Sequence, residues 1–588
     1  MCGIFGYVGN KQTAPALTLA ALKTLEYRGY DSWGIAAKRA ATIVVDKHTG
    51  KISAATTSLK DSHIAIGHTR WATHGGVTRA NAHPHISCNK RLAVVHNGIV
   101  ENFQRIKKDL LSKGHSFSSD TDTEVIVHLV EELHKKHGFA TAVRMAFEKL
   151  DGLNAIVVMN SQSKEIVAVK NGSPLLVARD DNGYYFCSDI SGVMTHTNDV
   201  YYMKNNEMVI CSAGKIQLIQ LPSAKIIPLR FKKVKLDKRS VSKGKYKHYL
   251  EKEICDQPGV IAQRAREGSK DALALAAAIR RARGTFMIGC GTAAYACMAG
   301  TYFFSRIARE HINFSIASEF EYLLDYVTDK TLVMPISQSG ETIDVTESVD
   351  RARQKGARSA ALTNVQGSTL ARMSDVVIPL NAGVERAVIS TKGYIAMVST
   401  LLHAAYAAAG DEAMGKKTLE QVAKSIKKLL KSSSVAHIKK VAKHLHKMQH
   451  IYILGRGSSY PVALEFAIKI KETTYIHAEG FAGGELKHGV IALIEKGTPV
   501  IVLAPLDETY DEIISNAQEV SARGGYIIGV SPKPNDVFDE YIPVEQAGEG
   551  TSIVSVVVGQ MLAYQLALEK GFEDPDKPRN LAKSVTVK

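Results

Sequence analysis

GTFMIGCGTAAYACMAGTYFFSRIA, residues 284–308, is a short apolar run followed by a Gly-x-Gly turn and a helical pattern. The stretch HIYILGRGSSYPVALEFAIKIKE, residues 450–472, repeats this order, with its turn at Gly455 in place of Gly289. A second matching pair, residues 331–357 and 499–525, follows at nearly the same offset. Alternating strands and helices predict a parallel α/β sheet. A period this long indicates two copies of one domain rather than a solenoid.

The chain before the repeat has a different pattern. Short β-type runs, such as residues 64–73 and 91–100, are separated by turn residues, and helical patterns interrupt them at 14–29 and 122–138. This indicates an α+β domain with large sheets. We therefore divide the chain into an α+β domain (1–228), a basic linker (229–248), two repeated α/β domains (249–425 and 426–575) and a C-terminal tail (576–588).

The composition is that of an ordinary globular protein, with 45% hydrophobic and 22% charged residues. The N-terminus does not resemble a signal peptide, and the most apolar stretch, residues 552–568, reads as a buried helix. We expect no membrane association. The seven cysteines are scattered without a CxxC pair, which indicates neither a disulfide framework nor a structural zinc. A reducing cytoplasm fits this pattern.

The net charge of +16 raises the question of nucleic-acid binding. Much of the excess lies in residues 230–248 and 424–447, where aromatic residues are not interleaved with the basic ones as in a single-strand binding surface. We expect no nucleic-acid partner. A positive field also suits small anionic substrates.

The stretch SQSGET, residues 337–342, follows a predicted strand and opens a predicted helix. It offers several hydroxyl groups, an amide and backbone N–H groups at a helix N-terminus, which favours phosphate binding. The alternative is a helix cap, which needs one hydroxyl. The Gly-x-Gly turns lack the third glycine and the acidic residue of a dinucleotide site, so we expect no nicotinamide cofactor.

The N-terminal stretch places Cys2 directly after Met1. If Met1 is removed, a free α-amine with a pKa of about 8 stands beside a thiol and can serve as its general base. The alternative is a buried cysteine in a strand. Arg70 suits a bidentate grip on a carboxylate. Asn97-Gly98 could supply an oxyanion hole or form a hairpin turn. Asp122, at a predicted helix start, could hold an amino-acid substrate or act as the N-cap of that helix.

Together these stretches resemble a known family. The motifs of the first domain are CGIFGYVG (2–9), LEYRGYDSWGIA (25–36), IGHTRWATHG (66–75), NAHPH (81–85), HNGIVEN (96–102) and SDTDTEV (119–125). Those of the remainder are ISQSGET (336–342), STKGY (390–394), IKETTYIHAEGFAGGELKHG (470–489) and DKPRNLAKSVTVK (576–588). They are similar to the glutamine–fructose-6-phosphate aminotransferases. In that family a class II, N-terminal-nucleophile (Ntn) glutaminase domain of αββα layers precedes two sugar-isomerase (SIS) domains of the flavodoxin-like, doubly wound type.

The resemblance implies an enzyme that converts fructose 6-phosphate and glutamine to glucosamine 6-phosphate and glutamate, the first step of hexosamine and UDP-N-acetylglucosamine synthesis. Ammonia would pass between the domains. In the glutaminase domain, Cys2 would be the nucleophile and Asn97 and Gly98 the oxyanion hole. The implied glutamine-binding residues are Arg70, Trp71, Thr73, His74, Gly98 and Asp122, with Trp71 also gating the ammonia channel.

In the SIS domains the resemblance implies that Glu472 moves a proton between C1 and C2, with Lys469 nearby. Lys583 would form a Schiff base, and His488, from a neighbouring subunit, would assist ring opening. The implied sugar-phosphate residues are Thr292, Ser337, Gln338, Ser339, Thr342, Val388 and Ser390. We therefore expect at least a homodimer, no metal and no cofactor.

The chain departs from the family pattern at Ala293, where a hydroxyl is usual, and at Arg386, Ala387 and Ile389. These changes place the sugar contacts in question and leave open a different ketose phosphate. An asparagine synthetase or an amidophosphoribosyltransferase would need an ATP or phosphoribosyl-pyrophosphate loop, and we find neither. Regulators and deglycases built from paired SIS domains generally lack the first domain.

Overall fold

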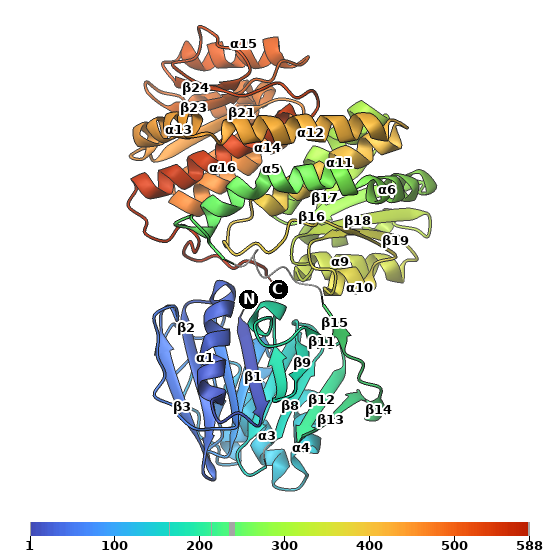
Figure 1. Cartoon of the computed structure of the whole chain (residues 1–588), viewed down its shortest axis with the longest axis vertical. Coiled ribbons are helices and arrows are strands. Elements are labelled where there is room, and N and C mark those ends of the chain that lie inside the picture. The colour runs from blue at the N-terminus through green and yellow to red at the C-terminus, as the bar shows by residue number, and fades with distance from the viewer. Residues whose placement is uncertain (1, 164, 213, 235–241, 586–588) are drawn as a thin grey trace. The chain divides into compact units, whose positions relative to one another are not determined.

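The computed structural model describes residues 2–163, 165–212, 214–234 and 242–585. The chain forms two compact units (Figure 1), the first of residues 1–238 with the segment from Ala582 onward, the second of residues 239–581. Residue 1, the middle of the predicted linker (235–241) and the last three residues lie outside the described residues.

The first unit contains two antiparallel sheets. The eight-stranded sheet has the order β15 (Lys232–Lys233), β11 (Asp199–Tyr202), β9 (Leu176–Asp180), β10 (Gly183–Cys187), β1 (Gly3–Gly9), β4 (Ile64–Arg70), β2 (Ser32–Arg39), β3 (Thr42–Thr49). The seven-stranded sheet has the order β14 (Lys225–Ile227), β13 (Lys215–Gln220), β12 (Glu207–Ser212), β8 (Glu165–Lys170), β7 (Asn154–Asn160), β6 (Leu92–Gly98), β5 (His85–Ile86). β15 carries the first sheet beyond residue 228, into the segment expected to be linker.

Alternation along β1 shows how the layers are built. Ile4 and Val8 point into the core between the two sheets, whereas Phe5 and Tyr7 pack on the other side against α1 (Ala14–Leu25). The far face of the second sheet is covered by α2 (Phe103–Ser112), α3 (Glu124–His134) and α4 (Phe139–Phe147). The predicted αββα arrangement is confirmed.

The second unit contains two parallel sheets with identical topology. The first has the order β17 (Asn313–Ile316), β16 (Gly284–Gly289), β18 (Thr331–Ser337), β19 (Arg358–Thr363), β20 (Val376–Pro379). The second has the order β22 (His477–Ala482), β21 (His450–Gly455), β23 (Pro499–Leu503), β24 (Tyr526–Ser531), β25 (Glu540–Pro543). In both, the second strand of the repeat lies outside the first, which is the flavodoxin-like order. The duplication predicted from the sequence is confirmed.

Helices of both repeats share one hydrophobic core. They are α5 (Tyr249–Glu267), α6 (Ser269–Arg281), α7 (Thr292–Phe303), α11 (Lys392–Ala408), α12 (Glu412–Leu429), α13 (Ser432–Leu445), α14 (Ser459–Thr474) and α16 (Thr551–Glu569). The helices α8 (Ala317–Phe320), α9 (Ile343–Gln354) and α10 (Thr369–Met373) pack in a separate cluster of the first repeat, and α15 (Tyr510–Ser521) packs in one of the second. The predicted boundary at 425/426 falls inside α12, and the chain turns into the second repeat after Leu429. α16 is apolar enough to cross a membrane, but it is almost entirely buried in this core, as the sequence predicted.

Candidate functional site

Cys2 lies directly before β1, and its surroundings join three of the motifs. The backbone N–H of Trp71 donates to the Cys2 Sγ atom at 3.2 Å. The Cys2 carbonyl accepts from Asn97 Nδ2 at 2.9 Å and from Arg28 Nε at 3.2 Å. Burial raises the pKa of the thiol, while the Trp71 N–H and the nearby guanidinium groups act in the opposite direction. The predicted nucleophile therefore lies beside the predicted oxyanion donor.

Asn97 and Gly98 are the last two residues of β6, so they do not form a hairpin turn. The Oδ1 atom of Asn97 lies 3.0 Å from His68 Nε2. Burial lowers the pKa of His68 to about 3, so the ring is neutral, and its Nε2 carries the hydrogen because an amide oxygen can only accept. This bond directs the Asn97 NH₂ group towards Cys2. His68 was not singled out from the sequence, although it lies inside the motif at residues 66–75.

Gly98 has a backbone conformation that other residues rarely adopt, with φ of +139°. A Cβ atom there would lie 2.3 Å from the Leu153 carbonyl oxygen. Only glycine fits this position.

Asp122 does not cap α3, because the N-cap residue of that helix is Thr123. Its carboxylate instead accepts a hydrogen bond from the Val100 N–H at 2.7 Å. This bond ties the chain just after Asn97-Gly98 to the start of α3. The two motifs, separated in sequence, thus form one wall of the same site.

Arg70 is buried, and its guanidinium donates to the carbonyls of the loop that follows. The acceptors are His74, Gly75 at 3.1 Å and Gly76 at 3.2 Å. A substrate carboxylate would have to share or replace these acceptors. Thr73 of the same loop is exposed, the His74 ring lies edge-on to Phe103 at 5.7 Å, and the Trp71 ring lies edge-on to Tyr30 at 5.9 Å.

In the second unit, the predicted phosphate loop lies at the carboxyl ends of adjacent strands β16 and β18. The Ser337 Oγ atom is 3.0 Å from Thr342 Oγ1 and accepts from the Gly340 N–H at 3.0 Å. The Ser339 hydroxyl accepts from the Glu341 N–H at 3.2 Å. The loop ends at the N-terminus of α9. Doubly wound sheets bind ligands at this switch point, and hydroxyl groups at a helix start suit a phosphate.

The remaining predicted sugar-site residues lie around the loop before α11. A Cβ on Gly393 would touch the Gln338 side chain, so these two residues are neighbours. The Ser390 hydroxyl donates to Glu385 at 3.1 Å, and the Val388 N–H donates to the Asp576 carbonyl at 2.8 Å. Glu385 also accepts from the N–H of Gly393 at 2.9 Å. The loop is thus held by Glu385, which the sequence analysis had not identified.

Lys469, on α14 of the second repeat, reaches into the first repeat. Its Nζ donates to Glu472 Oε2 at 2.7 Å and to Thr292 Oγ1, at the start of α7, at 3.0 Å. It also lies 3.6 Å from Glu465, one turn earlier on α14. Burial raises the pKa of Glu465 to about 8, although Lys469 opposes this. Glu465 was not predicted; its spacing of four residues from Lys469 was the available signal.

Two further predicted catalytic residues are His488 and Lys583. His488 is exposed at the end of the short 3₁₀ helix Gly483–His488, and within the described residues of the second unit it makes no hydrogen bond. Lys583 belongs to the first unit, in the segment from Ala582 onward. Their roles remain predictions.

The residues that depart from the family pattern lie in the hydrophobic core of the second unit or beside α5. Ala387 and Ile389 are fully buried in the shared hydrophobic core, and Ala293 is buried there too. The Arg386 guanidinium lies 5.4 Å from the Tyr249 ring centre and donates to the Tyr249 hydroxyl at 3.2 Å. These substitutions contact the core and α5.

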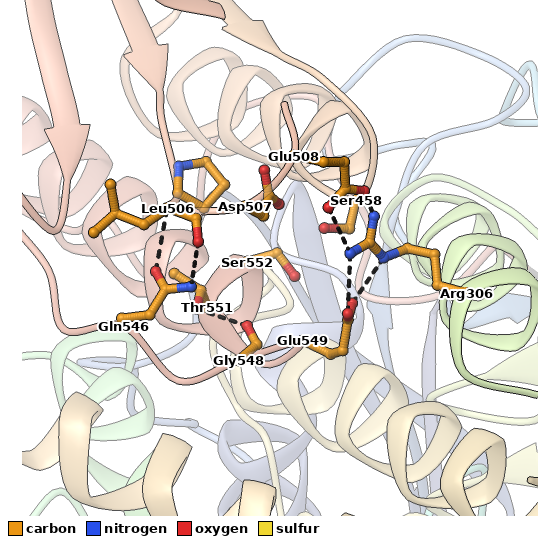
Figure 2. A pocket seen from close by; sticks show the side chains of 11 residues that line it. Arg306, Ser458, Leu506, Asp507, Glu508, Gln546, Gly548, Glu549, Thr551 and Ser552 are labelled. Carbon is orange, nitrogen blue, oxygen red and sulfur yellow. Dashed lines mark hydrogen bonds and ion pairs between the residues drawn. The ribbon is translucent and has the colours of Figure 1, made fainter. Parts of the chain in front are cut away.

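The second repeat carries a cavity of about 270 Å³ at the equivalent switch point, between β21 and β23. Figure 2 shows the Arg306 guanidinium directed towards Glu508 and Glu549, and the Nε of Arg306 lies 2.8 Å from Glu549. Asp507 also lines the cavity. Three carboxylates disfavour the binding of a phosphate in this cavity.

Models of two known domain families match the chain. A model of the SIS domain matches residues 278–407 and again residues 444–570. A model of the glutamine amidotransferase domain matches residues 47–219.

Full-length relatives are named glutamine–fructose-6-phosphate aminotransferase (isomerizing). The chain is 38% identical over 618 residues to one from Caldanaerobacter subterraneus and 39% identical over 614 residues to one from Thermus thermophilus. Both alignments cover 100% of each chain.

Solved structures resemble the second unit. The C-terminal domain of glucosamine-fructose-6-phosphate aminotransferase from Francisella tularensis is 31% identical, with a TM-score of 0.51, and covers 56% of this chain and 98% of its own. Tagatose-6-phosphate ketose/aldose isomerase from Escherichia coli, at 18% identity and a TM-score of 0.50, shares the fold over 57% of this chain and 96% of its own.

Proposed function

The chain belongs to the family of glutamine–fructose-6-phosphate aminotransferases, and on that premise we propose that it transfers the amide nitrogen of glutamine to fructose 6-phosphate. The products are glutamate and glucosamine 6-phosphate. This is the first committed reaction of amino-sugar synthesis.

In the first unit, the Cys2 thiolate attacks the glutamine amide carbon and forms a thioester. The α-amine left by removal of Met1 takes the thiol proton and returns it to the departing ammonia. Asn97 Nδ2 and the Gly98 N–H stabilise the oxyanion. Water then attacks the thioester, which releases glutamate and restores the thiol.

The glutamine itself is held by charge. Arg70 binds its α-carboxylate and Asp122 its α-amine, and residues of the 71–75 loop close over the substrate. The proximity of Cys2 to Asn97, held by His68, supports this assignment.

In the second unit, Thr292 and the hydroxyls of the 337–342 loop bind the sugar phosphate, with Val388 and Ser390 beside the sugar. The open-chain ketose forms a Schiff base with Lys583 of the C-terminal tail, expelling water, and ammonia then displaces the lysine at C2. Glu472 removes a proton from C1 and delivers it to C2, which converts the ketose imine to the aldose amine. Lys469 holds the Glu472 carboxylate in place.

We also propose the features that connect the halves. Ammonia passes from Cys2 to the sugar through a channel gated by Trp71, and His488 acts in a neighbouring subunit, so that the enzyme is at least a dimer. All seven cysteines are thiols, which fits a reducing cytoplasm.

The single observation that carries the proposal is the contact of Lys469 with both Glu472 and Thr292. It joins a candidate proton carrier to a candidate phosphate ligand in a chain that also places Cys2 beside an oxyanion donor.

The test is to incubate the purified protein with glutamine, with and without fructose 6-phosphate, and to quantify glutamate and glucosamine 6-phosphate together. We expect near equal amounts of both products and faster glutamate release with the sugar. The Cys2→Ala variant should lose glutamine-dependent product but keep its thermal unfolding midpoint. Glutamate without amino sugar would overturn the assignment of the acceptor.

A further inference from the structure

A cluster outside the proposed site brings together a thiol, two imidazoles and a carboxylate in the first unit. Cys88 lies in the turn between β5 and β6, His115 follows α2, and His128 and Glu131 lie on α3. One ligand atom of each lies within 4.8 Å of all the others. The imidazoles and the carboxylate are buried, whereas Cys88 is exposed. The cluster is therefore assembled from three segments that are distant in sequence.

Four of the six separations within the cluster lie close to those of a tetrahedral metal site, and all six are within 4.8 Å. Cys88 Sγ lies 3.5 Å from His128 Nδ1 and 3.8 Å from His115 Nδ1. Glu131 Oε2 lies 3.3 Å from each of these two nitrogens. Zinc bonds of about 2.0–2.3 Å in a tetrahedron place neighbouring ligand atoms about 3.3–3.6 Å apart. One ion at the centre would therefore reach all four atoms with little movement.

The outer nitrogens of the two histidines face carboxylates. His115 Nε2 lies 3.0 Å from Glu132, at hydrogen-bond distance, whereas His128 Nε2 lies 3.7 Å from Glu124, close enough for an ion pair but not for a hydrogen bond. Metal-binding histidines usually donate their second nitrogen to a carboxylate, which fixes the tautomer and leaves the first nitrogen for the metal. Here both Nδ1 atoms face the centre of the cluster.

Glu131 is oriented in the same way. Its two oxygens accept from the backbone N–H groups of Cys88 and Asn89, at 3.0 Å each. The carboxylate is thus tied to the turn that carries the thiol.

An ion-pair cluster without metal is the competing explanation. Although burial acts against it, the carboxylates of Glu124 and Glu131 raise the pKa of His128 to about 9. That explanation accounts for the two histidines and the carboxylates beside them. It gives no reason for the Cys88 Sγ atom to face the same point.

We propose that Cys88, His115, His128 and Glu131 bind one Zn²⁺ ion. Thiolate and imidazole donors in a tetrahedral arrangement favour zinc over magnesium or calcium. Binding releases the thiol proton, and any proton held by the two histidines, to solvent. The charges of the thiolate and the Glu131 carboxylate then balance that of the ion.

Four protein ligands leave no open position, so the role of the site is structural. The ion would cross-link the turn before β6, through Cys88, to the middle of α3, through His128 and Glu131. β6 ends at Asn97-Gly98, and α3 begins two residues after Asp122. The site thereby fixes the two elements that carry one wall of the Cys2 pocket. The ligands span residues 88 to 131 without a CxxC pair, which is why no metal site could be predicted from the sequence.

The test uses the full chain, purified without a metal-binding tag from zinc-containing medium. We expect about one zinc per chain by mass spectrometry of metals, and a sulfur-to-cobalt charge-transfer band after exchange with Co²⁺. Chelation should lower the unfolding temperature of the first unit by several degrees.

Two pairs of variants make the test specific. Cys88→Ser and His128→Gln should each lower the bound zinc at least about fivefold and abolish the response to the chelator. The controls, Cys255→Ser and His137→Gln, lie outside the cluster and should keep both. Zinc-treated wild-type protein that retains less than about 0.2 ions per chain after gel filtration, and shows no cobalt–thiolate band, would overturn the proposal, as would a Cys88→Ser variant that binds zinc like wild type.

Discussion

The Nε2 atom of His68, on β4, lies 3.0 Å from the Oδ1 atom of Asn97, on β6, and so links the two sheets of the first unit behind Cys2. Because His68 is neutral, its N–H donates to the amide oxygen, and the amide NH₂ of Asn97 is left facing Cys2. His68 is therefore a positioning residue for the oxyanion hole.

Replacing His68 by Ala should lower kcat for glutamine hydrolysis about 10- to 100-fold with KM nearly unchanged, since an oxyanion donor acts in the transition state. Gln, which can also donate to Asn97, should restore part of the loss. Steady-state kinetics with glutamine alone measures both constants.

The control is a double-mutant cycle with Asn97→Ala. If His68 acts through Asn97, the double variant should be no slower than Asn97→Ala alone. Multiplicative losses would show that His68 acts by another route.

Replacing Glu472 by Gln should separate the two halves of the reaction. Formation of glucosamine 6-phosphate should fall by about 10²–10⁴-fold because the proton carrier is lost. Glutamine hydrolysis without sugar should stay within about twofold. Product quantification by mass spectrometry measures both. Glu485→Gln, an exposed carboxylate of the same repeat, is the matched control; equal losses in the two variants would contradict the assignment.

The first unit should become less stable as the pH falls below about 6.5. Burial lowers the pKa of five histidines there, His68, His83, His85, His96 and His196. In the unfolded chain these groups take up protons near pH 6.5, whereas in the folded unit they do not. The contribution of these histidines to the free energy of unfolding is therefore present above about pH 6.5 and is lost as the pH falls below it.

The unfolding temperature at pH 7 and pH 5 tests this prediction. His83→Gln should reduce the difference between the two, because one such group is removed. His137→Gln, an exposed position, should leave it unchanged. A difference that is the same in His83→Gln and wild type would contradict the prediction.

The departures from the family pattern should not alter sugar recognition. Arg386→Ala should keep the KM for fructose 6-phosphate within about twofold. The unfolding temperature should fall by a few degrees, because a cation–π contact and a hydrogen bond to Tyr249 are lost. A tenfold rise in KM would place Arg386 in the sugar site.

The sequence predicted the fold where local pattern decides it. Strand and helix periodicity, and the repeat around Gly289 and Gly455, were sufficient for the layers and for the doubly wound topology. That Cys2, Asn97 and Asp122 share one site was implied by the resemblance of their motifs to a known family.

What the sequence could not predict depends on contacts between distant segments. In the sequence His68 is one residue of a predicted strand, and its role becomes evident only because β6 brings Asn97 within hydrogen-bond distance. Glu465 reads as a helix residue until Lys469 is seen to be buried next to it. Cys88 and His128 form a cluster only when α3 packs against the turn before β6.

Nitrogen transfer itself is the most direct test of the central claim. Protein given glutamine labelled with nitrogen-15 at the amide, fructose 6-phosphate and excess unlabelled ammonium should form glucosamine 6-phosphate that carries mainly the heavy isotope. That result would show transfer from the Cys2 site to the sugar without release of ammonia to solvent. Labelled ammonium in solution together with unlabelled amino sugar, or with none, would contradict it.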